Sequence, residues 1–177
     1  NNETKVKNLS EVIIGQIEVI SRVATAFSEF AQLPKRNDEE INLNREIRNV
    51  LTIFSDENIF IHASHDNIMM KIDKDYLARI IINLVTNASQ AKADNRKSVI
   101  NVDIEKIEKR IKIIVNDNGV GISPDKLEKI FDPNFTSKNS GMGIGLTMVK
   151  RMVEDYNGTI TVVSEVDKGA TFTISMP

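Results

Sequence analysis

The sequence contains no cysteine and no tryptophan, and only four prolines. Without cysteine there are no disulfides and none of the thiolate ligands of the common structural zinc sites, which fits a reducing compartment. No apolar run reaches the roughly 18 residues of a membrane-spanning helix, and no signal-peptide pattern is present. With 23 Lys+Arg against 25 Asp+Glu, the sequence also lacks the basic excess of a protein that binds nucleic acid or anionic lipid.

These absences predict a cytoplasmic chain that binds no nucleic acid and makes no direct contact with a membrane. The first residue is asparagine rather than methionine, so we expect a fragment of a longer protein, and that parent could be anchored in a membrane. With 41% hydrophobic residues, the chain can bury the core of one domain with an appendage.

The apolar residues of the first segment follow a heptad rhythm. Between Val6 and Phe30 they recur three and four residues apart, which predicts a long helix. Its wide apolar face favours a helix bundle, so the helix needs partner helices; packing on its own domain is the alternative. Pro34 ends the pattern. We therefore expect a bundle helix over residues 1–34, a linker over 35–40 and a globular domain over 41–177.

The globular part alternates strand and helix patterns. Asn44 and Asp75 are the predicted caps of two helices, and Ser123 with Pro124 predicts the start of a short third one. A further helix is expected from Ile144 to about residue 157. The predicted strands cover residues 41–43, 58–63, 68–72, 98–107, 110–116, 159–164 and 171–176. His62 then falls in a strand and His65 in a turn, so both are expected to be ordinary structural or surface residues.

Three glycines at alternate positions, Gly141, Gly143 and Gly145, precede the helix that starts near Ile144. Their amides are uncovered by side chains, and the first turn of a helix offers unpaired N–H donors to a phosphate. The spacing matches neither the P-loop nor the dinucleotide-binding pattern, so the run alone fits a flexible loop equally well.

Two asparagines interrupt the otherwise apolar helix after Asp75. Asn83 and Asn87 are four residues apart and share one face, and burying such amides without partners costs on the order of 1 to 3 kcal/mol each. An asparagine carbonyl oxygen is a suitable ligand for Mg²⁺ whose other positions hold water and phosphate oxygens. Hydrogen bonds to neighbouring backbone are the alternative.

Asp117 stands where a strand enters the glycine-containing segment 117–122. Its carboxylate could accept a hydrogen bond from an exocyclic amine such as that of adenine. Guanine presents an acceptor oxygen instead, and a site built on such a contact can discriminate by roughly 10⁴. As a lone motif, Asp-Asn-Gly is more often a turn.

Taken together, these motifs resemble the ATP-binding domain of sensor histidine kinases, within the superfamily that includes gyrase, a chaperone and mismatch-repair ATPases. The matching segments are 83–88, 117–122, 131–133, 141–146 and 169–172, in the family's order and approximate spacing. The Phe-x-Pro-x-Phe-Thr-Ser-Lys lid before the glycines is similar to kinases of the nitrogen-regulation type. Residues 1–34 look like the second helix of that family's dimerisation and phosphotransfer hairpin.

The resemblance implies an α/β (α+β) two-layer sandwich: a mixed, mostly antiparallel sheet covered on one face by three helices and preceded by a long bundle helix. It also implies a protein-histidine kinase that uses ATP and Mg²⁺. Asn87 would hold the metal, Asn83 and Lys138 would be catalytic, and Asp117 would bind adenine. The implied nucleotide-binding set is Asn83, Asn87, Asp117, Gly119, Gly121, Lys138, Gly141, Met142, Gly143, Ile144, Gly145, Leu146 and Thr171.

The family's phosphorylated histidine lies on the first hairpin helix, and neither His62 nor His65 matches its signature. The resemblance therefore implies transfer of the γ-phosphoryl group to a histidine outside this fragment, with a response regulator receiver domain as a further partner and a homodimeric parent. Two alternatives remain open. One is an ATPase clamp, in which related proteins carry a glutamate base where Asn83 stands, and the other is an ATP-sensing interaction module without turnover.

Overall fold

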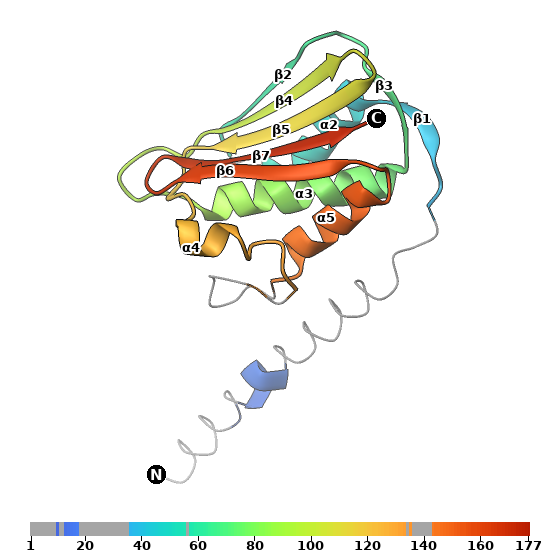
Figure 1. Cartoon of the computed structure of the whole chain (residues 1–177). Helices are drawn as coiled ribbons and strands as arrows, with labels where there is room; N and C mark the ends of the chain where they lie inside the picture. Colours follow the sequence, from blue (N-terminus) through green and yellow to red (C-terminus); the bar gives the residue numbers. More distant parts are fainter. Residues whose placement is uncertain (1–9, 11–12, 18–35, 56, 134, 136–142) are drawn as a thin grey trace, which may run out of the picture.

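A five-stranded sheet forms the centre of the computed structural model, which describes residues 10, 13–17, 36–55, 57–133, 135 and 143–177 (Figure 1). The strand order is β2-β4-β5-β7-β6. β2 and β4 are parallel, whereas the β4–β5, β5–β7 and β7–β6 pairs are antiparallel, which confirms a mixed, mostly antiparallel sheet. The strands are β2 (Ile59–Ala63), β4 (Ile100–Ile107), β5 (Arg110–Asp117), β6 (Thr159–Glu165) and β7 (Gly169–Met176).

A second, two-stranded antiparallel sheet joins β1 (Glu39–Asn42) to β3 (Met69–Ile72). The sequence predicted strands near both places but not this pairing. β1 begins within the expected linker, and Leu43 starts a helix instead of ending the strand. Most of the predicted helix over residues 1–34 lies outside the described residues. Residues 13–17 are helical, and the division into domains stays a prediction.

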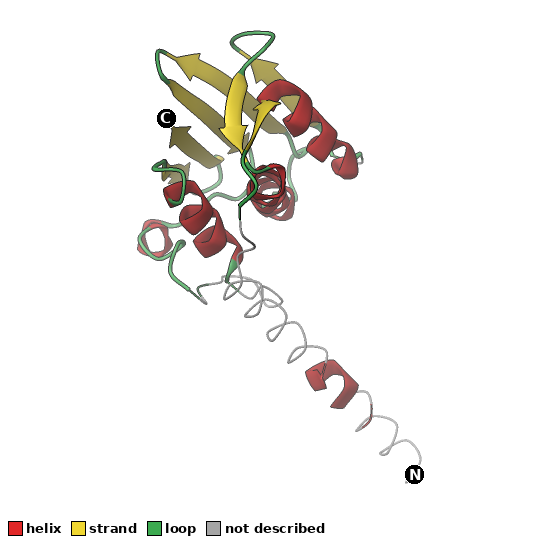
Figure 2. Cartoon of the chain, turned by 90° about the vertical axis from the view of Figure 1, so that its right-hand side faces the viewer, coloured by secondary structure: helices red, strands yellow, loops and turns green. Residues whose placement is uncertain are grey.

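Three helices, α2 (Leu43–Leu51), α3 (Lys74–Gln90) and α5 (Gly145–Glu154), lie on one face of the large sheet (Figure 2). A 3-10 turn (Thr52–Phe54) continues α2, and a single-turn helix, α4 (Pro124–Leu127), follows the predicted start at Ser123. The arrangement confirms the two-layer sandwich. No helix in the described part of the chain is both long and apolar enough to cross a membrane.

The structure corrects both predicted helix caps by two residues. Asn42, not Asn44, caps α2, because its side-chain oxygen accepts a hydrogen bond from the Arg45 N–H at 2.9 Å. Asp73, not Asp75, caps α3 by accepting from two N–H groups of the first turn, at 2.8 and 3.1 Å. A cap must lie outside the helix so that its side chain reaches back to those donors. Asn44 is buried inside α2 instead.

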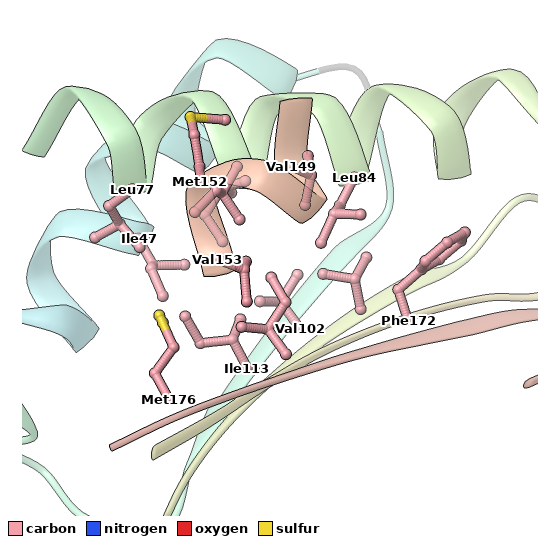
Figure 3. Packing of buried hydrophobic residues seen from close by; sticks show 14 of the residues in the cluster. Ile47, Leu77, Leu84, Val102, Ile113, Val149, Met152, Val153, Phe172 and Met176 are labelled. Carbon is pink, nitrogen blue, oxygen red and sulfur yellow. The ribbon is translucent and has the colours of Figure 1, made fainter. Parts of the chain in front are cut away.

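Alternating residues of the strands pack against the helices to form the core (Figure 3). Val102 of β4 and Ile113 of β5 are fully buried, and Leu84 of α3 lies above them in the same cluster. The intervening strand residues face away from the helices, as the period of two in the sequence predicted.

Because Leu84 is fully buried, truncating it to alanine should remove about 2 to 5 kcal/mol of stability.

Tyr156, just after α5, contacts the segment before β1 through a hydrogen bond and a cation–π interaction. The tyrosine hydroxyl donates to the Asp38 carboxylate and accepts from the Asp73 N–H at 2.9 Å. The Arg36 guanidinium lies over the ring, 4.4 Å from its centroid. Burial and the hydrogen bond to Asp38 raise the pKa of Tyr156 to about 12. The folded state therefore keeps the Tyr156 hydroxyl protonated at neutral pH.

We expect replacement of Tyr156 by phenylalanine to change how stability depends on alkaline pH. The raised pKa stabilises the fold fully below about pH 10, the unfolded value, and this contribution is lost as pH rises to about 12. Tyr156→Phe should cost about 1 to 3 kcal/mol at pH 8, because Asp38 and the Asp73 N–H lose a partner. Urea unfolding from pH 8 to 11 should then show a shallower fall than in wild type; parallel curves would contradict this assignment.

Candidate functional site

A cavity of about 490 Å³ opens between α3, the N-terminal end of α5 and the adjoining ends of β5 and β7. It is large enough for a nucleotide-sized ligand. Residues from every one of these elements line it. They are Asn83, Asn87, Gln90, Ala91, Asp117, Val120, Gly121, Ile122, Lys126, Ile130, Phe135, Gly143, Ile144, Gly145, Leu146, Ala170 and Phe172.

The α3 wall presents the two predicted asparagines. Asn83 and Asn87 are both half-buried and line the cavity. The Asn83 amide nitrogen donates to the Arg79 carbonyl at 2.8 Å, which is the backbone bond that the sequence left open as an alternative. Its carbonyl oxygen faces α5, where a Cβ added to Gly145 would lie only 2.5 Å away. Glycine at position 145 therefore allows α5 to approach this oxygen closely.

A buried carboxylate lines the same cavity. Asp117, at the end of β5, is 5% exposed, and its Oδ1 accepts a hydrogen bond from the Gly119 N–H at 2.8 Å. Burial raises the pKa of Asp117, while backbone N–H donors of Gly119 and Ala170 oppose that rise. Among the described carboxylates only Asp73 is also buried, and it caps α3. Asp117 is thus the buried acceptor available to a ligand in this cavity.

The two glycines after Asp117 have different places. Gly121 lines the cavity with φ of +70°, and a Cβ there would lie 2.1 Å from the Glu165 carbonyl oxygen. Gly119 does not line the cavity but packs against the end of α3, where an added Cβ would meet the Ala91 carbonyl oxygen at 2.2 Å. Both positions therefore require glycine, and Gly119 shapes the site from behind.

The N-terminus of α5 forms the third wall. Gly143, Ile144, Gly145 and Leu146 line the cavity, and no side chain of the described residues caps the helix. The N–H groups of the first helical turn and the positive end of the helix dipole suit a phosphate. Thr147 fastens this end of α5 by donating to the Phe131 carbonyl at 3.1 Å. Lys138, Gly141 and Met142 lie outside the described residues and remain predictions.

Like Gly119, Thr171 is a predicted site residue that the structure places outside the cavity lining. Its hydroxyl accepts a hydrogen bond from the Asn116 amide at 2.7 Å on the sheet face away from the helices. Its neighbours Ala170 and Phe172 line the cavity instead, because side chains alternate along β7. The period of two could have shown this. The residues that line the cavity without having been predicted are Gln90, Ala91, Val120, Ile122, Lys126, Ile130, Phe135, Ala170 and Phe172.

A divalent cation would find oxygen ligands here but no cluster of carboxylates. Among the described residues no group of three or more His, Cys, Asp or Glu is placed to hold a metal. The amide oxygen of Asn87, on the cavity wall, fits Mg²⁺, which commonly takes one or two protein ligands and completes its shell with water and phosphate oxygens.

The chain matches a known protein family and is similar to named relatives and solved structures. Residues 72–177 match the family described as histidine kinase-, DNA gyrase B-, and HSP90-like ATPase. The chain is 33% identical over 175 residues to sensor histidine kinase ZraS of Escherichia coli (strain K12), covering 96% of this chain and 37% of that protein. The structure resembles the nucleotide-free catalytic domain of histidine kinase ThkA, with a TM-score of 0.72, 28% identity and coverage of 80% of this chain and 95% of that one. It also shares the fold of ThkA in complex with response regulator protein TrrA, with a TM-score of 0.76 at 22% identity, over 94% of this chain and 49% of that one.

Proposed function

The chain belongs to the histidine kinase-, DNA gyrase B-, and HSP90-like ATPase family, and from this premise we propose that it is the ATP-binding kinase domain of a sensor histidine kinase. It spans 37% of the length of ZraS, so the activity of a whole kinase is part of the proposal. One observation carries it. One cavity is lined by a buried carboxylate, by two amides and by the N-terminus of a helix.

In this proposal, Asp117 accepts a hydrogen bond from the exocyclic amine of adenine. The apolar lining residues Val120, Ile122 and Phe172 bury the base against the sheet. Guanine would place a carbonyl oxygen against the Asp117 carboxylate, so that two acceptors would face each other with no donor between them. The cavity therefore selects ATP over GTP.

The triphosphate lies along the first turn of α5, whose N–H groups neutralise part of its charge. Asn87 would hold Mg²⁺ through its amide oxygen and Asn83 would support the same shell, while Lys138, which lies outside the described residues, would supply positive charge to the phosphates. When bound, the metal neutralises the charge that develops on the phosphate oxygens. Catalysis then consists mainly of positioning and charge stabilisation.

The acceptor in this proposal is a histidine outside the cavity. An imidazole nitrogen from a helical hairpin attacks the γ-phosphorus, the bond from phosphorus to the β,γ-bridging oxygen breaks, and ADP leaves. Asn83 cannot act as the water-activating base of an ATPase clamp, because an amide does not take up a proton near neutral pH. The phosphorylated hairpin would then pass the group to a response regulator, the kind of partner seen with ThkA.

Phosphotransfer to a supplied acceptor tests this function. We expect the purified chain to bind Mg-ATP without labelling itself, because His62 lies in β2 and His65 in a bend, and neither lines the cavity. Mixed with a histidine-bearing helical hairpin and γ-labelled ATP, it should produce an acid-labile phosphoramidate on the hairpin. The label is measured on gels before and after acid treatment.

Two controls separate the alternatives. Asn87→Ala should remove the label, whereas Asn49→Ala, which changes an exposed asparagine of α2, should not. Self-labelling that disappears in a His62 or His65 variant would overturn the proposal. ATP binding and hairpin docking without any transfer would instead favour an ATP-sensing interaction module.

A further inference from the structure

Arg96, in the loop between α3 and β4, binds three backbone carbonyls with one side chain. Its Nε donates to the Asn118 carbonyl at 2.6 Å, and its Nη2 donates to the carbonyls of Gly119 at 2.7 Å and Asp167 at 2.5 Å. The side chain is half-buried and lines no part of the cavity. It thus joins the loop after β5 to the turn between β6 and β7.

One of these bonds bears directly on the Asp117 carboxylate. The peptide unit between Asn118 and Gly119 is planar, so its carbonyl and its N–H point in opposite directions. The carbonyl accepts from Arg96, and the N–H donates to Asp117 Oδ1 at 2.8 Å. A bond that fixes the carbonyl therefore fixes the donor that holds the carboxylate, and the two hydrogen bonds polarise the same peptide.

The third carbonyl connects Arg96 to the other side of Asp117. The turn that carries Asp167 packs onto the backbone of Asp117, where a Cβ added to Gly169 would lie 1.9 Å from the Asp117 carbonyl oxygen. The Asp167 N–H also donates to the Val120 carbonyl at 2.8 Å. Directly after the turn, the Ala170 N–H is the second backbone donor to the Asp117 carboxylate. Arg96 is therefore bonded to both segments whose N–H groups orient Asp117.

We propose that Arg96 is the positioning residue for base recognition: by holding the 118–119 peptide and the 167 turn together, it aims the Asp117 carboxylate at the adenine amine. This rests on the adenine contact of the proposed function. A guanidinium is needed because its planar fork reaches adjacent carbonyls with Nε and Nη2, whereas a lysine offers its donors from a single atom.

The test compares Arg96→Ala and Arg96→Lys with Lys97→Ala, in which the neighbouring exposed cation is removed. Calorimetry would give the affinities of each chain for ATP, GTP and adenosine, with folding checked by circular dichroism. We expect both Arg96 variants to lose about tenfold in affinity for ATP and adenosine alike. The preference for ATP over GTP should shrink by the same factor, and the gain in ATP affinity on adding Mg²⁺ should stay as in wild type. Lys97→Ala should behave as wild type.

Every other outcome contradicts either the role of Arg96 or the adenine contact on which it rests. If wild type prefers ATP and both Arg96 variants keep its affinities for ATP and for GTP, Arg96 has no positioning role. If the variants lose ATP and GTP affinity equally, so that the ratio is preserved, the arginine is only structural. If wild type itself binds ATP and GTP equally, the adenine contact of the proposed function fails, and this proposal fails with it. Should Arg96→Ala not fold, Arg96→Lys alone decides, because it keeps the charge and most of the side-chain volume.

Discussion

Asp117→Asn should weaken ATP binding by about 1.5 to 3 kcal/mol, or roughly tenfold to a hundredfold, as measured by calorimetry at neutral pH. The carboxylate is buried at the end of β5 and lines the cavity, so a charge-assisted bond to adenine would be well shielded from water. The amide would keep one acceptor oxygen but lose the charge. It would also place an N–H₂ group where the adenine amine needs an acceptor.

The fold should tolerate this change. Burial raises the pKa of Asp117, so ionisation of the carboxylate works against folding as pH rises through that pKa. We therefore expect the unfolding midpoint of Asp117→Asn without ligand to be no lower than that of wild type at pH 7. Asp103→Asn is the matched control, because this half-buried carboxylate of β4 lies on the sheet face away from the helices. Unchanged ATP affinity in a folded Asp117→Asn protein would refute the adenine contact.

Asn87→Ala should abolish the gain in ATP affinity that Mg²⁺ produces. The amide oxygen is the ligand that we assign to the metal on the α3 wall, and alanine offers none. ATP titrations with and without Mg²⁺ should then give the same affinity for the variant. Binding of adenosine, which carries no phosphate, should stay near the wild-type value.

Adenosine thus serves as an internal control for Asn87, and Asn49→Ala serves as the control for replacing a helical asparagine at an exposed position. An equal loss of affinity for adenosine and for Mg-ATP would assign Asn87 to the shape of the cavity rather than to the metal. If the variant still gains ATP affinity on adding Mg²⁺, another residue binds the metal, and Asn83 is the next residue to replace.

Local patterns in the sequence predicted the elements well and their ends less well. The alternation of residues 98–107 and 110–116 gave the β4–β5 hairpin, and the periodicity after Asp75 gave α3. Both helix caps were placed two residues late, because Asn42 and Asn44, like Asp73 and Asp75, are chemically equivalent candidates within one turn. Only the backbone conformation decides which member of each pair lies outside the helix.

Contacts between distant segments were the part that sequence patterns could not supply. The β1–β3 pairing joins residues about 30 positions apart, and neither strand has a sequence feature that identifies the other as its partner. Arg96 went unnoticed for a related reason, since its three acceptors are backbone carbonyls that any residue type provides. Thr171 was assigned from a motif, although the period of two along β7 turns its side chain away from the cavity.

The polar residues of the site were more readily predicted than its apolar lining. Asn83 and Asn87 interrupt an apolar helix, where unpaired amides are costly, and this signalled a ligand. Asp117 was singled out because it stands where a strand enters a glycine-containing segment, and all three residues line one cavity. Ile122, Ile130 and Phe172 also line it, but nothing in the sequence distinguishes them from ordinary core residues.

A crystal structure of the chain with Mg²⁺ and a non-hydrolysable ATP analogue would test most directly how the cavity holds its ligand. We expect the adenine amine within about 3 Å of the Asp117 carboxylate and the Asn87 amide oxygen about 2.1 Å from the metal. The phosphates should lie against the first turn of α5. A base bound elsewhere, with Asp117 contacting only its own backbone donors, would contradict the assignment of this cavity as the ATP site.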